Sequence, residues 1–317
     1  MKDGLRGRPC LVLGAGGFIG SALCRALSEV GAQVHGFGRE PAYPDAPGPV
    51  RFTRGEFDNK AAIARAVDGA EIVFHLLGGS TPDLSNKDPV AELQGLAQSI
   101  RLLETCRLAS VSRVVFVSSG GTVYGVPASV PVTEEAPTDP ISAYGINKLI
   151  VEKYLHLFRH LHGIDSVVLR VANPFGPFQD PFRRQGVIAA LTHAIANRRP
   201  AEVWGDGRVV RDFVYVDDVA EALMLSAAYE GPHRVFNVGS GVGRSVLDVV
   251  RDIGRVLDWA DVPVIHKAGR VADVPANVLD IERIRRELGW VPRTGWMDAL
   301  RLTAAWIGRA HRPADSL

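Results

Sequence analysis

A tyrosine and a lysine stand four residues apart in the segment AYGINK, at Tyr144 and Lys148. On a helix, residues four apart share one face, so we expect these two side chains to be neighbours. A tyrosine with its ordinary pKa of about 10 is a poor base at neutral pH. A lysine ammonium beside it favours the phenolate and lowers that pKa, and the positive nicotinamide of a cofactor would act in the same direction. Such a pair could take a proton from a sugar hydroxyl while hydride leaves to the cofactor.

A glycine-rich turn near the N-terminus could bind the phosphates of that cofactor. Gly14, Gly17 and Gly20 form the pattern G-x-x-G-x-x-G between an apolar run and a segment with helical spacing. Glycines allow a tight turn and let a pyrophosphate approach the backbone, and the helix that follows supplies free N–H groups. The acid expected about 20 residues later to bind the adenosine ribose is missing, because Gly38 and Arg39 occupy its place. Arg39 could contact a 2′-phosphate, stack on adenine or be a solvated surface residue, which leaves both NAD and NADP open.

The elements that must position these residues can be read from the apolar pattern. Segments read as strands at 10–13, 70–79 and 112–119, each with an apolar centre, alternate with segments of helical spacing at 89–110 and 143–163. Strands that are apolar throughout indicate a parallel sheet covered by helices on both faces. We therefore predict an α/β fold, in which residues 1–173 form a Rossmann-type doubly wound parallel sheet. Residues 174–317, where short strands mix with helices, are predicted to form mainly a smaller C-terminal substrate-binding lobe, interleaved with the end of the sheet.

Composition excludes several other classes of protein. The formal net charge of the 317 residues is +1, which is too small for a nucleic-acid-binding surface. No apolar run approaches the ~20 residues that span a bilayer, and the N-terminal segment lacks the apolar core of a signal peptide. The three cysteines form no C-x-x-C pair and imply no disulfide framework. We expect a cytoplasmic protein with no nucleic-acid partner, membrane association or metal site.

Several separated segments resemble the motifs of the extended short-chain dehydrogenase/reductase family, within its nucleotide-sugar epimerase and dehydratase group. They run along nearly the whole chain: GAGGFIG, GEFDN, VFHLLGG, SSGGTVYG, YGINK, LRVANPFGP, VWGDGRVVRDFVYVDDVAEAL, FNVGSG, GRVADVP and, at 288–292, LGWVP. The resemblance implies NAD as the cofactor, with NADP possible because of Gly38 and Arg39. The residues that it places at the cofactor are Gly14, Gly17, Phe18, Ile19, Gly20, Arg39, Glu56, Phe57, Leu77, Gly78, Ser118, Tyr144 and Lys148.

The resemblance also implies a substrate and a partner. The substrate would be a nucleotide sugar, probably UDP-linked. Asn173 and Arg211 would contact its diphosphate, Trp204 would flank its base, and Arg270 and Asp273 would bind diphosphate and ribose. The family pairs the helices predicted at 89–106 and 143–158 into an intersubunit bundle. Because both segments are apolar on more than one face, we expect a homodimer.

One departure from the family pattern concerns the catalytic hydroxyl. The serine or threonine that assists the tyrosine falls on Gly120 in this chain. Along a regular strand, Ser118, Gly120 and Thr122 point to one face. The hypothesis is that the chain bends at Gly120 and Gly121 and brings Thr122 to the site; Ser118 or a water molecule are the alternatives. A second departure is the missing Asn-Asn-x-x-Gly-Thr of the long helix, where Leu96 and Ser99 stand instead.

The same segment discriminates between the reactions of the group. A dehydratase would need an acid pair where this chain has Gly121 and Thr122. We therefore predict a nucleotide-sugar 4-epimerase that acts through a transient 4-keto intermediate, with Tyr144 as acid and base and bound NAD as hydride acceptor and donor. The alternatives are an NAD(P)-dependent nucleotide-4-keto-sugar reductase and a non-catalytic nucleotide-binding regulator. The intact Tyr144 and Lys148 argue against the regulator.

Overall fold

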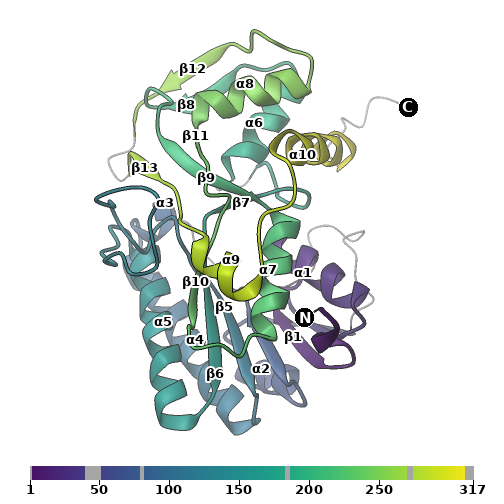
Figure 1. The fold of residues 1–317 in the computed structure, drawn as a ribbon. Helices are drawn as coiled ribbons and strands as arrows, with labels where there is room; N and C mark the ends of the chain where they lie inside the picture. The colour runs from purple at the N-terminus through teal and green to yellow at the C-terminus, as the bar shows by residue number, and fades with distance from the viewer. Residues whose placement is uncertain (1, 40–50, 79–81, 183–185, 270–273, 311–317) are drawn as a thin grey trace.

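The computed structural model describes residues 2–39, 51–78, 82–182, 186–269 and 274–310. Its centre is a sheet of seven strands, all paired in parallel, in the order β10-β6-β5-β4-β1-β2-β3 (Figure 1). The strands are β1 (Pro9–Leu13), β2 (Gln33–Gly38), β3 (Arg51–Arg54), β4 (Ile72–His75), β5 (Arg113–Ser119), β6 (Asp165–Val171) and β10 (Val235–Val238). The predicted doubly wound α/β fold is confirmed.

Helices cover both faces of the sheet, which explains why its strands are apolar throughout. In β1, Val12 belongs to the core on one face, whereas Leu11 and Leu13 belong to the core on the other. The first core is closed by α1 (Phe18–Glu29), α7 (Val216–Ala227) and α9 (Glu282–Leu288), and the second by α2 (Lys60–Val67), α4 (Pro89–Leu108) and α5 (Ala143–His162). The two long helices α4 and α5 pack against each other. No helix in the described ranges is long and apolar enough to cross a membrane.

Local sequence signals explain where the helices of the second core begin. The side chains of Asn59, Asp88 and Ser142 accept hydrogen bonds from free N–H groups at the N-termini of α2, α4 and α5. Such caps are each worth about 1 kcal/mol. At the other end of α5, Gly163 has a φ of +72°, a conformation that glycine adopts without strain. The long helix α5 therefore has defined ends on both sides.

The rest of the chain forms a smaller lobe beyond the carboxyl ends of the strands, at the top of Figure 1. Its strand β9 (Val210–Tyr215) pairs with β7 (Asn173–Phe175), β11 (Gly243–Ser245) and β13 (Ala276–Asn277), and β8 (Ala201–Trp204) pairs with β12 (Val264–Lys267). The helices α6 (Val187–Ala196), α8 (Val246–Val256) and α10 (Trp296–Ala310) complete it, while α3 (Pro82–Ser85) and a 3-10 turn (Lys2–Leu5) belong to the first lobe. Because α7 and β10 return to the large sheet, the chain crosses between the lobes more than once. The division at residue 173 stays a prediction.

Candidate active site

The glycine turn follows β1 at the carboxyl edge of the sheet, where ligands of open parallel sheets bind. Gly14 has a φ of +88°, and its N–H donates to Phe37 O of the neighbouring strand at 2.8 Å. A side chain at Gly20 would overlap the carbonyl oxygen of Gly14, so only glycine lets α1 start this close to the turn. Gly17 caps α1 without a side-chain hydrogen bond. The backbone N–H groups at this end of the helix are thus left for an anion, and the cradle fits a dinucleotide pyrophosphate.

The structure brings Tyr144 and Lys148 together on α5, as predicted. The Lys148 ammonium lies 5.6 Å from the centroid of the Tyr144 ring and donates a hydrogen bond of 2.8 Å to Val117 O on β5. A Cβ atom at Gly78 would lie 3.2 Å from the Lys148 Nζ, so the predicted cofactor segment after β4 runs directly beside the ammonium. The pair therefore faces the carboxyl ends of β4 and β5.

The electrostatics of this pair differ from the sequence-based expectation. Burial raises the pKa of Tyr144 to about 12, and the Glu92 carboxylate on α4 adds to that rise in pKa. Burial also lowers the pKa of Lys148 to about 8, against the opposing charges of Glu152 and Glu92. In the protein without cofactor, Lys148 alone does not depress the pKa of the tyrosine. At neutral pH the resting pair is a neutral phenol beside an ammonium, and a further positive charge is needed to stabilise the phenolate.

The first turn of α5, which carries Tyr144, is capped from outside the helix. The N–H of Ala143 donates to Asn86 Oδ1 at 2.9 Å, and the N–H of Tyr144 donates to Ser85 Oγ at 3.1 Å. The adjacent N–H of Gly145 is bound by Ser142 Oγ at 3.1 Å. These caps fix the backbone at Tyr144. The roles of Ser85 and Asn86 were missed in the sequence, because more than 50 positions separate them from the N–H groups that they bind.

A buried polar network lies beneath the pair. Glu152, one turn beyond Lys148, forms an ion pair with Arg170 of β6 at 2.7 Å. Arg170 also donates to the hydroxyl of Tyr124 at 3.0 Å, and that hydroxyl donates to Asn237 at 2.7 Å. The hydroxyl of Ser118 donates to Glu152. Ser118 is therefore committed to the network, which argues against it as the missing catalytic hydroxyl.

The segment after β5 bends where the two glycines stand. The strand ends at Ser119, and the N–H groups of Thr122 and Val123 both turn back to Ser119 O, at 3.2 and 3.1 Å. The chain thus does not continue as a regular strand to Thr122, and it bends at Gly120 and Gly121, as the hypothesis requires. A Cβ at Gly120 would lie 2.5 Å from Leu279 Cδ1, so position 120 has no room for a hydroxyl side chain in this conformation.

Two hydroxyls remain near the bend. The Oγ1 of Thr122 is buried and has no hydrogen-bond partner among the described residues. Its backbone carbonyl oxygen would lie 3.0 Å from a Cβ at Gly145, which places Thr122 against the first turn of α5. The hydroxyl of Ser119 lies on the side of Gly121 and Asn173. A Cβ atom placed at Gly121 would be 4.0 Å from both Ser119 Oγ and Asn173 Oδ1. A buried hydroxyl without a hydrogen-bond partner lowers the stability of the fold. Such a group is typical of a position that binds a ligand.

Three of the predicted substrate residues, Asn173, Trp204 and Arg211, lie on the second lobe and its junction with the sheet. Asn173 donates to Asp212 O at 2.9 Å, and Arg211 donates to Val274 O at 2.5 Å. Trp204, at the end of β8, is about half exposed. Arg270 and Asp273 lie outside the described residues. The structure thus brings Asn173 and Arg211 together around β9, with Trp204 on another strand of the same lobe.

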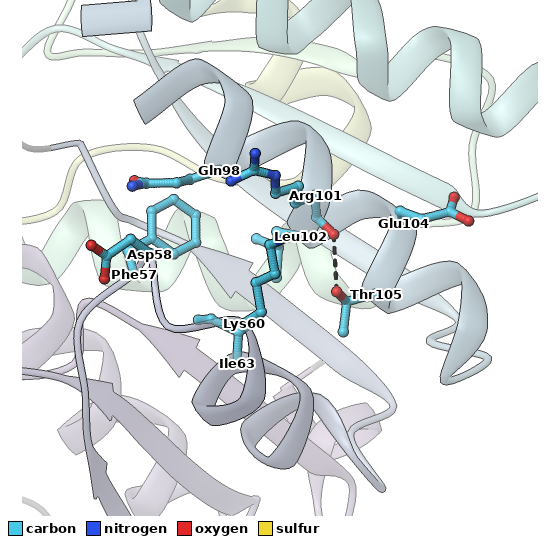
Figure 2. Close-up of a pocket in the computed structure, with 9 residues that line it drawn as sticks. All are labelled: Phe57, Asp58, Lys60, Ile63, Gln98, Arg101, Leu102, Glu104 and Thr105. Atoms are coloured by element: carbon cyan, nitrogen blue, oxygen red, sulfur yellow. Dashed lines mark hydrogen bonds between the residues drawn. The ribbon is translucent and has the colours of Figure 1, made fainter. Parts of the chain in front are cut away.

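On the cofactor side, Phe18 and Ile19 begin α1, half-buried against the first core, and Leu77 packs beside Gly14 at the end of β4. Arg39 and Glu56 are exposed, while Phe57 is half-buried 5.6 Å from the ring of His75. A hollow of about 240 Å³ lies next to Phe57 and is lined by residues of α2 and α4 such as Ile63 and Leu102. Figure 2 shows the side chains that line it. Phe57 is the one predicted site residue in its lining, so this hollow is separate from the catalytic pair.

Comparison with known proteins agrees with this geometry. Residues 10–239 match the NAD dependent epimerase/dehydratase family. The UDP-glucose 4-epimerase of Mycolicibacterium smegmatis is 34% identical over 309 residues, covering 94% of this chain and 97% of that protein. The Thermotoga maritima UDP-glucose 4-epimerase, solved with UDP-glucose, superposes with a TM-score of 0.90 at 32% identity, covering 95% of this chain and 99% of that one. The Thermus thermophilus UDP-glucose 4-epimerase in complex with NAD superposes with a TM-score of 0.88 at 30% identity. The match covers 96% of this chain and 100% of that one. The resemblance in the motifs is confirmed, and the chain belongs to the NAD-dependent epimerase/dehydratase family.

Proposed function

We propose that the protein is a UDP-sugar 4-epimerase with Tyr144 as its acid and base. The observation that carries the proposal is the placement of Tyr144 and Lys148 at the carboxyl ends of β4 and β5, beside the glycine cradle after β1. The UDP-glucose 4-epimerases among its relatives support the same reaction. NAD, which the glycine turn after β1 would hold, would supply a hydride acceptor and donor for the sugar C4.

The residues of the chain then have separate tasks. Tyr144 takes the proton of the sugar 4-hydroxyl and later gives it back, and Lys148 stabilises the phenolate between these steps. Thr122 supplies the hydroxyl that Gly120 lacks, because its Oγ1 is buried, unpaired within the described structure and next to the first turn of α5. Asn173 and Arg211 hold the diphosphate, and Trp204 flanks the base. Arg270 and Asp273, which precede β13 in the sequence, are part of the same proposal.

The alternative reactions fit less well. A reductase consumes one reduced nicotinamide in each turnover, whereas the relatives reported above carry epimerase names. A non-catalytic regulator would not need a capped tyrosine beside a buried ammonium. The epimerase is therefore the function that the site supports best.

We further propose that the protein is a homodimer in the cytoplasm. The outer faces of α4 and α5 expose Val90, Leu93, Leu108, Ile146, Leu157 and Leu161. Two copies that pair these helices would remove this apolar surface from water, which is favourable at roughly 25 cal/mol per Å². Cys10, Cys24 and Cys106 are buried and unpaired, which supports a reducing compartment.

The reaction can be tested without added cofactor. The purified protein should interconvert UDP-glucose and UDP-galactose with no nicotinamide added, followed by chromatography of the nucleotide sugars. Tyr144→Phe should lower turnover by about 10²–10⁴-fold while cofactor binding is retained, because only the proton transfer is removed. Tyr154→Phe, on the same helix, is the matched control and should leave turnover unchanged. A need for stoichiometric reduced nicotinamide would identify a reductase instead.

The assignment of the hydroxyl rests on two variants. Thr122→Val keeps the shape of the side chain and removes its hydroxyl, and we expect kcat to fall about tenfold or more with the melting temperature retained. Ser119→Ala removes the other hydroxyl near the bend and should change kcat little. The opposite pattern, a loss with Ser119→Ala and none with Thr122→Val, would assign the role to Ser119.

A pH profile tests the electrostatics of the pair. The Glu92 carboxylate raises the pKa of both Tyr144 and Lys148, so Glu92→Gln should lower both pKa values. One limb of the profile follows deprotonation of Tyr144 and the other follows deprotonation of Lys148. Both limbs of kcat/KM against pH should therefore move to lower pH. Glu104→Gln, on the same helix but paired with Arg107 at 2.6 Å, should leave the profile in place. A shift of the Glu92→Gln profile to higher pH would contradict this account.

The oligomeric state can be measured by light scattering. The protein should have about twice the chain mass of 34.2 kDa. Leu93→Glu places a charge on the proposed interface and should give monomers, since a buried unpaired charge is strongly unfavourable. Leu302→Glu, at a comparably exposed leucine on α10, is the control that should leave the dimer intact. A wild-type monomer at micromolar concentration would refute the proposal.

A further inference from the structure

The Lys148 ammonium lies over an aromatic ring that the proposed catalytic set does not include. Lys148 is buried, and its one hydrogen bond within the described residues goes to Val117 O of β5, at 2.8 Å. The preceding residue is Phe116, whose ring centroid lies 4.8 Å from the Lys148 Nζ. The ring of Tyr144 is farther away, at 5.6 Å. An ammonium is attracted to the negative face of an aromatic ring, most strongly where water is excluded.

The ring of Phe116 is held in place from the neighbouring strand. Phe116 is 1% exposed and belongs to the core beneath α4 and α5. His75 of β4 pairs with it in register, and their ring centroids are 5.2 Å apart. His75 is fixed in turn by the ring of Phe57, at 5.6 Å, and by Ser99 Oγ of α4, at 3.0 Å from its Nε2. The packed ring of Phe116 therefore has little room to turn away from the ammonium.

Two carboxylates also face Lys148. Glu152 of α5 and Glu92 of α4 favour the charged lysine, whereas burial disfavours it and lowers the pKa of Lys148 to about 8. The carboxylate of Glu152 is shared with Arg170 of β6, at 2.7 Å. A lysine with a pKa near 8 loses its charge at neutral pH if its surroundings become slightly less favourable, since one pKa unit corresponds to only about 1.4 kcal/mol.

The other titratable neighbours of Lys148 are uncharged near neutral pH. Burial raises the pKa of Tyr144 to about 12. Burial and the charge of Lys148 lower the pKa of His75 to about 3. Neither group changes its charge between pH 6 and pH 9. The charge of Lys148 in that range therefore depends on burial, on the two carboxylates and on the ring.

We propose that Phe116 is a positioning residue of the reaction, which holds the Lys148 ammonium in place and in its charged form. The inference rests on the proposed function, because it concerns the lysine that stabilises the phenolate of Tyr144. A leucine at position 116 would fill much of the same space but would offer no negative face to the ammonium. Without the ring, the pKa of Lys148 falls further and a smaller share of the protein carries the ammonium near pH 7.

Unfolding in urea at 25 °C tests the contact without turnover. At pH 6 Lys148 is charged in the native protein, so Phe116→Leu removes both packing and the attraction to the ammonium. At pH 9 Lys148 is mostly neutral, and only the packing is lost. We expect the urea midpoint of Phe116→Leu to fall further below that of the wild type at pH 6 than at pH 9, by about 0.5 M. Phe74→Leu, at an equally buried ring in the core on the other face of the sheet, should give the same loss at both pH values.

A background without the lysine charge separates this contact from other titrations. In Lys148→Met, Phe116→Leu should lower the midpoint equally at both pH values, because no ammonium faces position 116. Phe116→Met keeps more of the apolar volume and carries the same test if the leucine variant does not fold. Two results would overturn the inference: a loss in the wild-type background that is equal at pH 6 and pH 9, or a pH-dependent loss that persists in Lys148→Met.

The pH profile of kcat/KM tests the role of Phe116 in the reaction. The limb that follows deprotonation of Lys148 should move to lower pH by about one unit in Phe116→Leu and stay in place in Phe74→Leu. Glu92→Gln differs, because it moves both limbs. An unmoved limb in Phe116→Leu would overturn the role in the reaction. A wild-type protein that does not epimerise, but unfolds with the expected pH dependence, would refute the proposed function and still support the contact between Phe116 and Lys148.

Discussion

The geometry of the proposed catalytic pair, Tyr144 and Lys148, depends on the buried ion pair between Arg170 of β6 and Glu152 of α5, whose side chains are 7% and 4% exposed. Tyr144, Lys148 and Glu152 follow one another at intervals of four residues, so the contact that holds Glu152 also sets the rotation of the helix that carries the pair. Arg170 reaches the hydroxyl of Tyr124 as well, which ties the bend after β5 to the same point. Removing one partner of a buried ion pair typically costs about 3–5 kcal/mol, a large share of a total stability of about 5–15 kcal/mol. The network therefore sets the position of the site as well as the packing beneath it.

The two halves of the catalytic pair respond to burial in opposite ways, and this has a chemical consequence. Burial favours the neutral form of each group, raising the pKa of Tyr144 to about 12 and lowering that of Lys148 to about 8. Glu92 and Glu152 counteract this for Lys148, which keeps most of its charge at pH 7, whereas Glu92 further disfavours the phenolate. A neutral tyrosine is thus the resting state. In the proposed reaction, the positive charge of an oxidised nicotinamide held beside Lys148 would favour the phenolate of Tyr144.

Much of the framework was predictable because it depends on local pattern. Apolar strands and glycines at three-residue spacing specify a covered parallel sheet with a phosphate-binding turn, and the structure agrees at Gly14 and Gly20. The tyrosine and lysine followed from the helical period. The caps of Ser85 and Asn86 on α5 could not be foreseen, since they join segments far apart in the chain. The contact that excludes a side chain at Gly120 could not be foreseen for a related reason, since it comes from Leu279, more than 150 residues away. Glu152 could have been found, because it continues the face of Tyr144 and Lys148.

The bend after β5 also connects the two lobes. Asn277 of β13 donates to Gly120 O at 3.2 Å, and it pairs in register with Arg211 of β9. The buried carboxylate of Asp212, next to Arg211, accepts hydrogen bonds from the N–H groups of Ser240, Gly241 and Leu279. Burial raises the pKa of Asp212, and these donors oppose that rise. The strand proposed to hold the diphosphate is therefore joined through short polar contacts to the turn that carries Thr122. A substrate bound on the second lobe would meet a catalytic turn already fixed in place, which reduces the reorganisation required at the reacting carbon.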